Sequence, residues 1–280
     1  MLKKSNTDFQ RKSIQCPRCN QLISIDAEVC IHCGLARPNL YGSLPILGDL
    51  ITGKLSFVNG IVLVCFTTYI LSLILDMGSL QILDDPFATL SPSAEALYKL
   101  GMGGVIPWQE GRWWSLVTAT YLHGGILHLA FNMLWLGRIG PLVEELFGAS
   151  RFWFIYCLAG LFGALISLWS GTFFFVGASG SIFGLFGALI YYGRSRGGVF
   201  GSNVFQQMAI WALFGFIFGL LMPNVDNWGH LGGFGAGLLL AWSLSYQEKV
   251  RQNFGQHVLA LTALVGVLVC FVFMFITFFT

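Results

Sequence analysis

The sequence predicts an all-α, polytopic membrane protein preceded by a small cysteine-containing module. Only 10% of its 280 residues are charged and 55% are hydrophobic, with 26 phenylalanines. This hydrophobic fraction is higher, and this charged fraction lower, than in a soluble globular protein of that size. Long apolar runs recur from about residue 56 onward. Four of the seven cysteines precede the first of these runs and form two Cys-x-x-Cys pairs.

The apolar runs predict seven transmembrane helices, near residues 56–75, 124–138, 152–170, 179–193, 205–222, 229–246 and 257–279. Some of these runs are shorter than the ~20 residues that a spanning helix usually needs. A polar stretch over residues 76–112 interrupts them, and a connection of that length predicts a functional or partly folded loop. No cleavable signal peptide is expected, because the first forty residues are polar.

The distribution of lysine and arginine predicts the orientation of the chain. With seven spans, the basic residues on the side of the N-terminus are Lys3, Lys4, Arg11, Lys12, Arg18, Arg37, Lys54, Arg138, Arg151, Arg194, Arg196, Lys249 and Arg251. Lys99 and Arg112 alone fall on the opposite side. The positive-inside rule therefore predicts a cytoplasmic N-terminus and a C-terminal Thr280 outside. The expected location is a bacterial plasma membrane.

The cysteine module has the spacing of a four-thiolate metal site, with candidate ligands Cys16, Cys19, Cys30 and Cys33. Disulfides rarely persist in the cytoplasm, so structural zinc is the favoured interpretation. A redox-active pair is the alternative, and His32 could replace one ligand. The segment has too few apolar residues to fold without a metal. The remaining cysteines, Cys65, Cys157 and Cys270, lie singly in apolar runs and are interpreted as small buried hydrophobes.

A serine and a histidine occur in glycine-rich membrane segments, as Gly177-Ala178-Ser179-Gly180 and Gly229-His230-Leu231-Gly232-Gly233. Polar residues at bilayer depth are costly and tend to face a cavity or a partner. A hydroxyl and an imidazole are the minimum for nucleophilic catalysis. Ser179 is expected at a helix N-terminus below the outer surface, reached by non-helical backbone over residues 171–177. Such backbone needs protein or a water-filled cavity around it.

Small residues at four-residue spacing accompany both polar residues. Gly180, Gly184 and Ala188 form one ridge, and Gly229, Gly233 and Gly237 form another. Such ridges allow two helix backbones to approach closely, which a hydrogen bond between Ser179 and His230 requires. The alternative interpretation is that the glycines serve packing alone and that both polar residues are structural.

A third segment holds two more candidate site residues, His128 and Asn132, which share one helix face because they are four residues apart. Both can donate a hydrogen bond to the oxygen of a tetrahedral intermediate, beside the backbone amide of Ser179. A hydrogen-bonding pair between helices is the alternative. His123 is expected to order the site or to contact loop waters. A metal pair with His128 is disfavoured because no carboxylate lies at suitable spacing.

These segments together resemble the rhomboid intramembrane serine proteases over about residues 56–246. The resemblance rests on His-x4-His-x3-Asn ending at Asn132, on Gly-x-Ser-Gly around Ser179 and on His-Leu-Gly-Gly from His230. Val143-Glu144, Gly148 and Arg151-Phe152 are also similar to the family pattern.

The resemblance implies that Ser179 is the nucleophile and His230 the general base, in a dyad without an acidic third member. His128, Asn132 and the Ser179 amide would stabilise the oxyanion, and catalysis would need no cofactor. Phe183 stands where some members have a tyrosine stacked on the histidine. The residues expected to support the site are His123, Gly177, Gly180, Phe183, Gly229 and Gly233.

The implied architecture is a six-helix core with one extra C-terminal helix. Residues 1–36 would form a cytoplasmic zinc-ribbon-like module, 37–55 a linker, 56–246 the protease core and 247–280 the extra transmembrane helix. The implied function is hydrolysis of peptide bonds in or near transmembrane segments of membrane proteins.

Two other functions are weighed against proteolysis. A proteolytically inactive, client-binding relative is the main alternative, although such proteins usually lack the serine or the histidine. A transporter is disfavoured because the spans lack acidic residues for coupling. The expected partners are transmembrane substrates, the lipid bilayer and a cytoplasmic protein bound by the module. Nucleic acid is disfavoured, since positive-inside topology explains the basic residues around the module.

Overall fold

The computed structural model describes residues 13–16, 19, 21–35, 38–39, 56–75, 90–222 and 225–279. The chain divides into two compact units, Met1–Leu55 and Ser56–Thr280. The linker predicted over residues 37–55 lies outside the described residues, apart from 38–39. So do the basic residues before Ser13 and the first part of the polar stretch, 76–89.

The N-terminal unit contains a short antiparallel hairpin of β1 (Ser13–Gln15) and β2 (Leu22–Ser24), in which Ile14 is paired with Ile23. Its buried apolar residues are Cys16, Ile23, Cys30 and Leu35. A core of this size cannot stabilise an independent fold without a cross-link or a metal. The four cysteines, as candidate ligands, could supply such a metal site.

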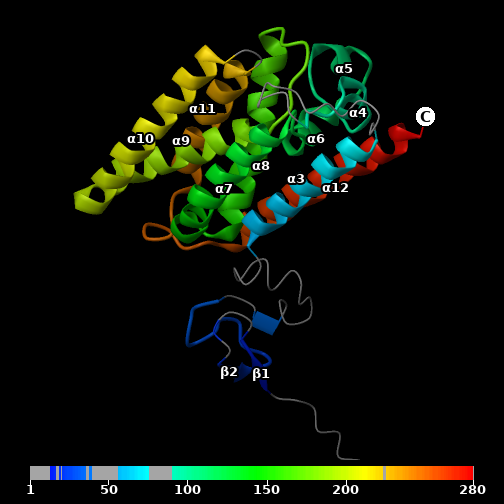
Figure 1. Ribbon diagram of the computed structural model, residues 1–280. Helices are drawn as coiled ribbons and strands as arrows, with labels where there is room; N and C mark the ends of the chain where they lie inside the picture. The colour runs from blue at the N-terminus through cyan, green and yellow to red at the C-terminus, as the bar shows by residue number, and fades with distance from the viewer. Residues whose placement is uncertain are drawn as a thin grey trace, which may run out of the picture. The chain divides into compact units, whose positions relative to one another are not determined.

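The second unit is helical (Figure 1). Seven of its described helices have 18 or more residues, namely α3 (Phe57–Ile74), α7 (Ile126–Phe147), α8 (Ala149–Trp169), α9 (Ser179–Arg196), α10 (Gly198–Leu221), α11 (Asn227–Leu244) and α12 (Phe254–Phe278). The predicted all-α membrane fold is confirmed. α7 and α10 each extend several residues beyond the apolar runs that predicted them.

Five of these helices are long and apolar enough to cross a membrane: α3, α7, α8, α10 and α12. α9 and α11 are as long as α3 but are not among the five. α9 is rich in glycine and ends with Arg194 and Arg196. Its side chains are mostly buried against other helices, so its composition is not selected for contact with lipid.

α9 occupies the centre of the bundle and packs against α8, α10 and α11. α10 lies at one edge of the bundle, and α12 lies at the other (Figure 1). α12 packs mainly against α8. The central trio of α8, α9 and α11 therefore forms the framework on which the other helices are placed.

Two charged residues, the half-buried Glu144 and the buried Arg151, hold the ends of helices. The Glu144 carboxylate accepts hydrogen bonds from Ser56 Oγ at 2.9 Å and from the backbone N–H of Phe57 at 2.8 Å. It thereby satisfies unpaired donors at the start of α3. Arg151 is 1% exposed and donates from Nη2 to the Val250 carbonyl at 2.8 Å. This bond ties the connection between α11 and α12 to the start of α8.

Between α3 and α7 the described chain forms four short helices, α4 (Ala94–Lys99), α5 (Val105–Gln109), α6 (Ser115–Thr118) and the 3₁₀ helix η2 (Ala119–Tyr121). The long loop is thus partly folded, as predicted. The non-helical segment before α9 is hydrogen-bonded through its backbone to this loop and to η2. Phe175 exchanges backbone hydrogen bonds with Gly103 at 2.8 and 3.1 Å, and the Gly177 N–H donates to the Ala119 carbonyl at 2.9 Å.

Candidate active site

Ser179 and His230 meet at the N-terminal ends of α9 and α11. α9 begins at Ser179, and His230 lies in the first turn of α11. The distance from Ser179 Oγ to His230 Nε2 is 2.9 Å, within hydrogen-bonding range. His230 is 7% exposed. The two groups therefore have the geometry that a base needs to accept the proton of a serine hydroxyl.

The His230 ring is held by an aromatic neighbour. Phe183, one turn after Ser179, stacks on it with ring centroids 4.2 Å apart and planes inclined by 16°. Within the described residues, His230 Nδ1 has no hydrogen-bond partner. Stacking thus provides the ring orientation that a carboxylate provides in a three-residue triad.

Asp226 lies close to this pair in sequence but is engaged elsewhere. Its Oδ1 accepts from the Gly229 N–H at 3.0 Å, so it is the N-cap of α11. Its Oδ2 accepts a short hydrogen bond from Ser167 Oγ of α8. Both carboxylate oxygens of Asp226 thus have described partners other than His230.

Glycines bring α9 and α11 together at the backbone, as the two predicted ridges require. A Cβ added to Gly233 would collide with the carbonyl group of Gly180, and one added to Gly237 would collide with that of Gly184. On α8, a Cβ at Gly163 would stand 2.7 Å from the Gly229 carbonyl oxygen. The separation between Ser179 and His230 is therefore fixed by backbone contact between their helices.

His128 presents one ring nitrogen toward the serine. Its Nδ1 accepts from the Gly124 N–H at 3.4 Å, so the proton of a neutral ring is on Nε2. A Cβ on Gly177 would lie 2.7 Å from that Nε2 and 3.7 Å from Ser179 Oγ. Gly177 also has a φ of +127°, which other residues rarely adopt. Glycine is required there, and the Nε2 of His128 faces the surroundings of Ser179.

Asn132 and His123 are buried, and neither has a described hydrogen bond to the serine. Asn132 Nδ2 donates to the His128 carbonyl at 2.8 Å, and no described hydrogen bond joins Asn132 to Ser179. The structure thus places Asn132 one turn from His128, with its amide turned to its own helix. His123 is completely buried, and its ring lies 5.1 Å from that of His128 in a T-shaped contact. It supports His128 by packing.

A small polar cavity lies beside the pair. Its volume is about 30 Å³, and its lining includes Ser167, Gly177, Ser179, Asp226 and His230. One water molecule needs roughly 10–15 Å³ and two to four polar partners. The backbone N–H groups in the first turn of α9 also lack partners within the helix. The arrangement therefore offers a nucleophile, a base, oxyanion donors and room for water.

The contacts that pair aromatic side chains of α7 with those of α10 were not predicted from the sequence. Trp135 and Trp211 lie 4.9 Å apart in an edge contact, and Phe131 and Phe218 lie 6.3 Å apart. Tryptophan within an apolar span was the available signal. It gave no indication of which helix the ring would face.

The N-terminal unit contains a second candidate site, the cluster of Cys16, Cys19, Cys30 and Cys33. The sulfur atoms of its four residues all lie within 4.8 Å of one another. Cys16 Sγ and Cys33 Sγ are 3.6 Å apart, and Cys19 Sγ and Cys30 Sγ are 3.7 Å apart. These separations are too long for disulfides, whose S–S bonds are about 2.05 Å. Four thiols this close together can bind a metal ion.

Comparisons with known proteins identify relatives of this chain. A family described as Rhomboid domain matches residues 110–247. The chain is 36% identical over 164 residues to Rhomboid protease GluP of Bacillus subtilis, covering 59% of this chain and 32% of that protein. It is 34% identical over 171 residues to RHOMBOID-like protein 4 of Arabidopsis thaliana, covering 59% of this chain and 42% of that protein.

The match covers most of the length of a third relative. Putative rhomboid protease YdcA of Bacillus subtilis is 31% identical over 162 residues, which are 55% of this chain and 75% of that protein. This chain belongs to the rhomboid family. The predicted resemblance is confirmed, and the rhomboid fold with its apolar helices makes the chain an integral, multi-pass membrane protein. It spans about a third to a half of the length of the first rhomboid relatives it matches.

Proposed function

We propose that the chain is an intramembrane serine endopeptidase in which Ser179 is the nucleophile and His230 the general base. The observation that carries this proposal is the 2.9 Å contact between Ser179 Oγ and His230 Nε2, on two helices locked by backbone contact. Two relatives named as rhomboid proteases support it.

In the first step, Ser179 Oγ attacks the carbonyl carbon of the peptide bond while His230 Nε2 takes the hydroxyl proton. The tetrahedral intermediate then collapses, and the protonated His230 gives its proton to the leaving amine. Water repeats the sequence on the acyl-enzyme and releases the carboxylic acid. The 30 Å³ cavity beside both side chains supports this step, because it has room for a water next to the base.

The oxyanion would be held by the Ser179 backbone N–H and by the Nε2–H of His128. The positive end of the α9 dipole stabilises negative charge at the same point. Asn132 joins these donors once its amide turns away from the His128 carbonyl. Donors of this kind act on the charge that develops in the transition state.

The substrate is proposed to be a transmembrane segment that reaches the serine laterally between α7 and α10. Aromatic side chains make contacts across this boundary, including the pair Trp135 and Trp211. Side chains of this kind can rotate aside without breaking backbone hydrogen bonds. Small or helix-destabilising residues at the cleavage site would lower the cost of unwinding the substrate.

Fluorophosphonate labelling of the purified full-length protein tests this function. We expect the wild type to be labelled and both Ser179→Ala and His230→Ala to lose labelling and cleavage of a model transmembrane substrate. Asp226→Asn is a comparison variant that leaves the dyad in place. Undiminished cleavage by Ser179→Ala would overturn the assignment. A folded wild type that neither labels nor cleaves would favour the client-binding alternative.

We also propose that the cysteine cluster holds a structural zinc ion. In a tetrahedral site with Zn–S bonds of ~2.3 Å, neighbouring sulfurs are ~3.8 Å apart. The sulfur separations of 3.6 and 3.7 Å fit this geometry. Gly34, with a φ of +72° after Cys33, completes the turn around the second pair. The ion would replace the core that so short a segment lacks.

Metal analysis of the purified protein tests the zinc proposal. One zinc per chain is expected, and Cys30→Ser should lose it, whereas Cys65→Ser should retain it. Cys65 is buried outside the cluster and is the matched control. Zinc bound equally by both variants would contradict the assignment, and a reversible disulfide in place of zinc would support the redox alternative.

The remaining assignments extend the same proposal. The N-terminus would be cytoplasmic and the C-terminus outside, in agreement with the positive-inside rule. Residues 1–36, 37–55, 56–246 and 247–280 would be the zinc module, linker, protease core and extra helix.

A further inference from the structure

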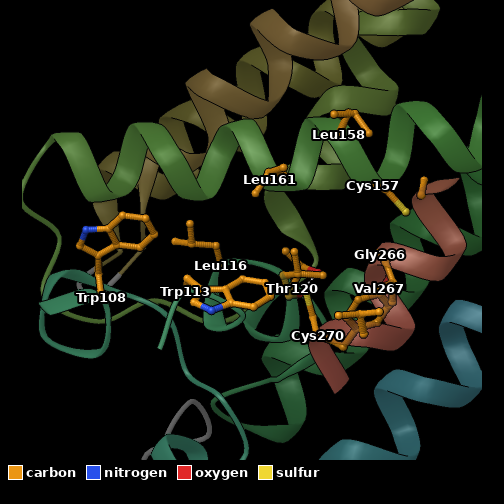
Figure 2. A pocket seen from close by; sticks show the side chains of 14 residues that line it. Trp108, Trp113, Leu116, Thr120, Cys157, Leu158, Leu161, Gly266, Val267 and Cys270 are labelled. Carbon is orange, nitrogen blue, oxygen red and sulfur yellow. Dashed lines mark hydrogen bonds between the residues drawn. The ribbon is translucent and has the colours of Figure 1, made fainter. Parts of the chain in front are cut away.

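A second, larger cavity lies between α8, α12 and the segment from α5 to η2 (Figure 2). Its volume is about 520 Å³, and its lining is apolar, including Trp108, Leu116, Cys157, Val267 and Cys270. Thr120 also lines it, but its hydroxyl donates to the Val117 carbonyl at 2.7 Å. That hydroxyl therefore has no need of a polar ligand.

The cavity is elongated and has distinct ends. Figure 2 shows Trp108 at one end, Cys157, Val267 and Cys270 at the other, and Trp113 between them. Trp108 and Trp113 are 43% and 44% exposed. Tryptophan is enriched at the membrane–water interface, and α8 and α12 are two of the five apolar helices. The cavity thus extends from the interface into the hydrocarbon layer.

α12 is anchored on both sides of the cavity, which keeps the space open. Near its start, His257 Nδ1 is 2.7 Å from Ser150 Oγ of α8. Near its end, Phe273 stacks on Trp114 with ring centroids 5.6 Å apart. Between these contacts stands Gly266, where an added Cβ would meet no atom within 4 Å. The gap between α8 and α12 therefore results from these two contacts and from the lack of a side chain at Gly266.

We propose that this cavity binds one acyl chain of a phospholipid, with the headgroup near Trp108 and the chain end near Cys157 and Cys270. A volume of 520 Å³ accommodates roughly 17 groups of about 30 Å³ each, the share of a water molecule and close to that of a methylene. This is the size of one fatty acyl chain. An unfilled gap would forgo dispersion contacts on both of its walls.

The other apolar occupants that a membrane offers do not fit. A transmembrane helix ~10 Å wide and ~30 Å long takes up roughly 2,400 Å³, several times the size of the cavity. A substrate helix or a helix from a second copy of the chain therefore cannot be enclosed in it. Water is excluded because apolar cavities stay dry.

The bound chain would also support the candidate active site from behind. Thr120 lines both this cavity and the small polar cavity beside Ser179. The adjacent Ala119 carbonyl accepts the Gly177 N–H at 2.9 Å. The acyl chain would thus press on the turn that holds the backbone two residues before Ser179. Binding itself does not depend on the proposed protease function.

Photocrosslinking in nanodiscs tests the proposal on the full-length protein. The probe is phosphatidylglycerol with a diazirine either near the headgroup or at the end of one acyl chain. After irradiation, mass spectrometry should find the first probe on peptides containing Trp108 or Trp113 and the second on peptides containing Cys157 or Cys270. Gly266→Leu should reduce the second signal at least fivefold.

The control is Gly60→Leu, on α3, where an added Cβ likewise meets no atom within 4 Å. It should leave the crosslinks unchanged. Ala263→Leu, which also fills the cavity, replaces Gly266→Leu if that variant does not fold. A yield at Cys157 and Cys270 no higher than at the exposed Leu63 of α3 would overturn the proposal. A yield unaffected by both filling variants would also overturn it.

Discussion

The two sides of α9 are built from different contacts. Toward α11, Gly180 and Gly184 meet Gly233 and Gly237 at the backbone. Toward α10, contact near Ser179 is made by aromatic rings, such as Phe183 against Phe216 with centroids 4.7 Å apart, whereas Gly193 and Gly201 bring the two backbones together at the other end of α9. Backbone contacts have no rotamer freedom, whereas rings can turn about their side-chain bonds. Near Ser179, the contacts toward α11 therefore fix a distance, whereas those toward α10 can yield.

This difference matches the two tasks that the proposed protease must perform. Proton transfer between Ser179 and His230 needs a separation held within a fraction of an ångström. Admission of a substrate helix needs a boundary that opens. Both residues of the dyad lie at the rigid side, and the aromatic contacts between α7 and α10 lie at the other. Variants on each side should therefore have effects of different size and sign.

The largest effect is expected from Gly233→Leu. The new side chain would collide with the Gly180 carbonyl group and force α9 and α11 apart. We expect complete loss of cleavage together with a large fall in thermal stability, since overpacking costs about 1–3 kcal/mol or more. Activity on a model substrate and thermal unfolding in detergent measure both.

The same helix provides the matched control for that change. At Gly235 an added Cβ meets no atom within 4 Å. Gly235→Leu should therefore retain activity and stability. If both substitutions lowered activity and thermal stability equally, α11 would tolerate no larger side chain at either position. The contact between α9 and α11 would then not be the cause, and the proposed difference between the two sides of α9 would be wrong.

A smaller loss is expected from Asn132→Ala. Removal of an oxyanion donor should lower kcat by roughly 10-fold or more, with little change in KM, because the interaction is made in the transition state. Single-turnover cleavage separates the two parameters. If KM rose while kcat stayed constant, Asn132 would contribute to substrate binding and not to oxyanion stabilisation. Its amide would then keep the observed hydrogen bond to the His128 carbonyl during the reaction.

The helices of the candidate site could be predicted to approach each other because each carries a local signal. Ser179 precedes Gly180 and opens a helix, and His230 precedes Gly233 on the next ridge. These patterns predicted that the two helices approach closely, and the backbone contacts agree. The cysteine spacing likewise predicted four sulfurs in one cluster. In each case the spacing of residues along the chain determines their spacing in three dimensions.

The remaining features depend on side-chain rotation and on packing between distant helices. The sequence does not indicate that the Asn132 amide faces the His128 carbonyl, or that Trp135 meets Trp211. The apolar runs near residues 179–193 and 229–246 were predicted as spans. Their helices, α9 and α11, are not among the five that are apolar enough to cross a membrane. In α9 this agrees with side chains that are mostly buried against neighbouring helices, whereas in α11 it reflects the many glycines and the polar first turn that form the site.

Phe183→Ala tests whether stacking takes the place of a third catalytic residue. Loss of an aromatic pair worth about 0.5–1.5 kcal/mol should slow cleavage by roughly 3- to 10-fold, because the His230 ring becomes free to rotate. Phe183→Tyr should restore nearly full activity. A Tyr variant as slow as the Ala variant would show that the para position has no space, and that stacking alone does not set the rate.

The smallest effect, and the one of opposite sign, is expected from Trp211→Ala. Removal of its contact with Trp135 should favour the open state between α7 and α10. The rate of cleavage should rise by about 2- to 5-fold, within what a lost aromatic pair allows. Leu213→Ala, at an exposed position on α10, is the matched control. If the Trp211→Ala protein cleaves more slowly while its fluorophosphonate labelling is unchanged, the aromatic contacts guide the substrate instead of restraining α10. Both sides of α9 would then position reacting groups.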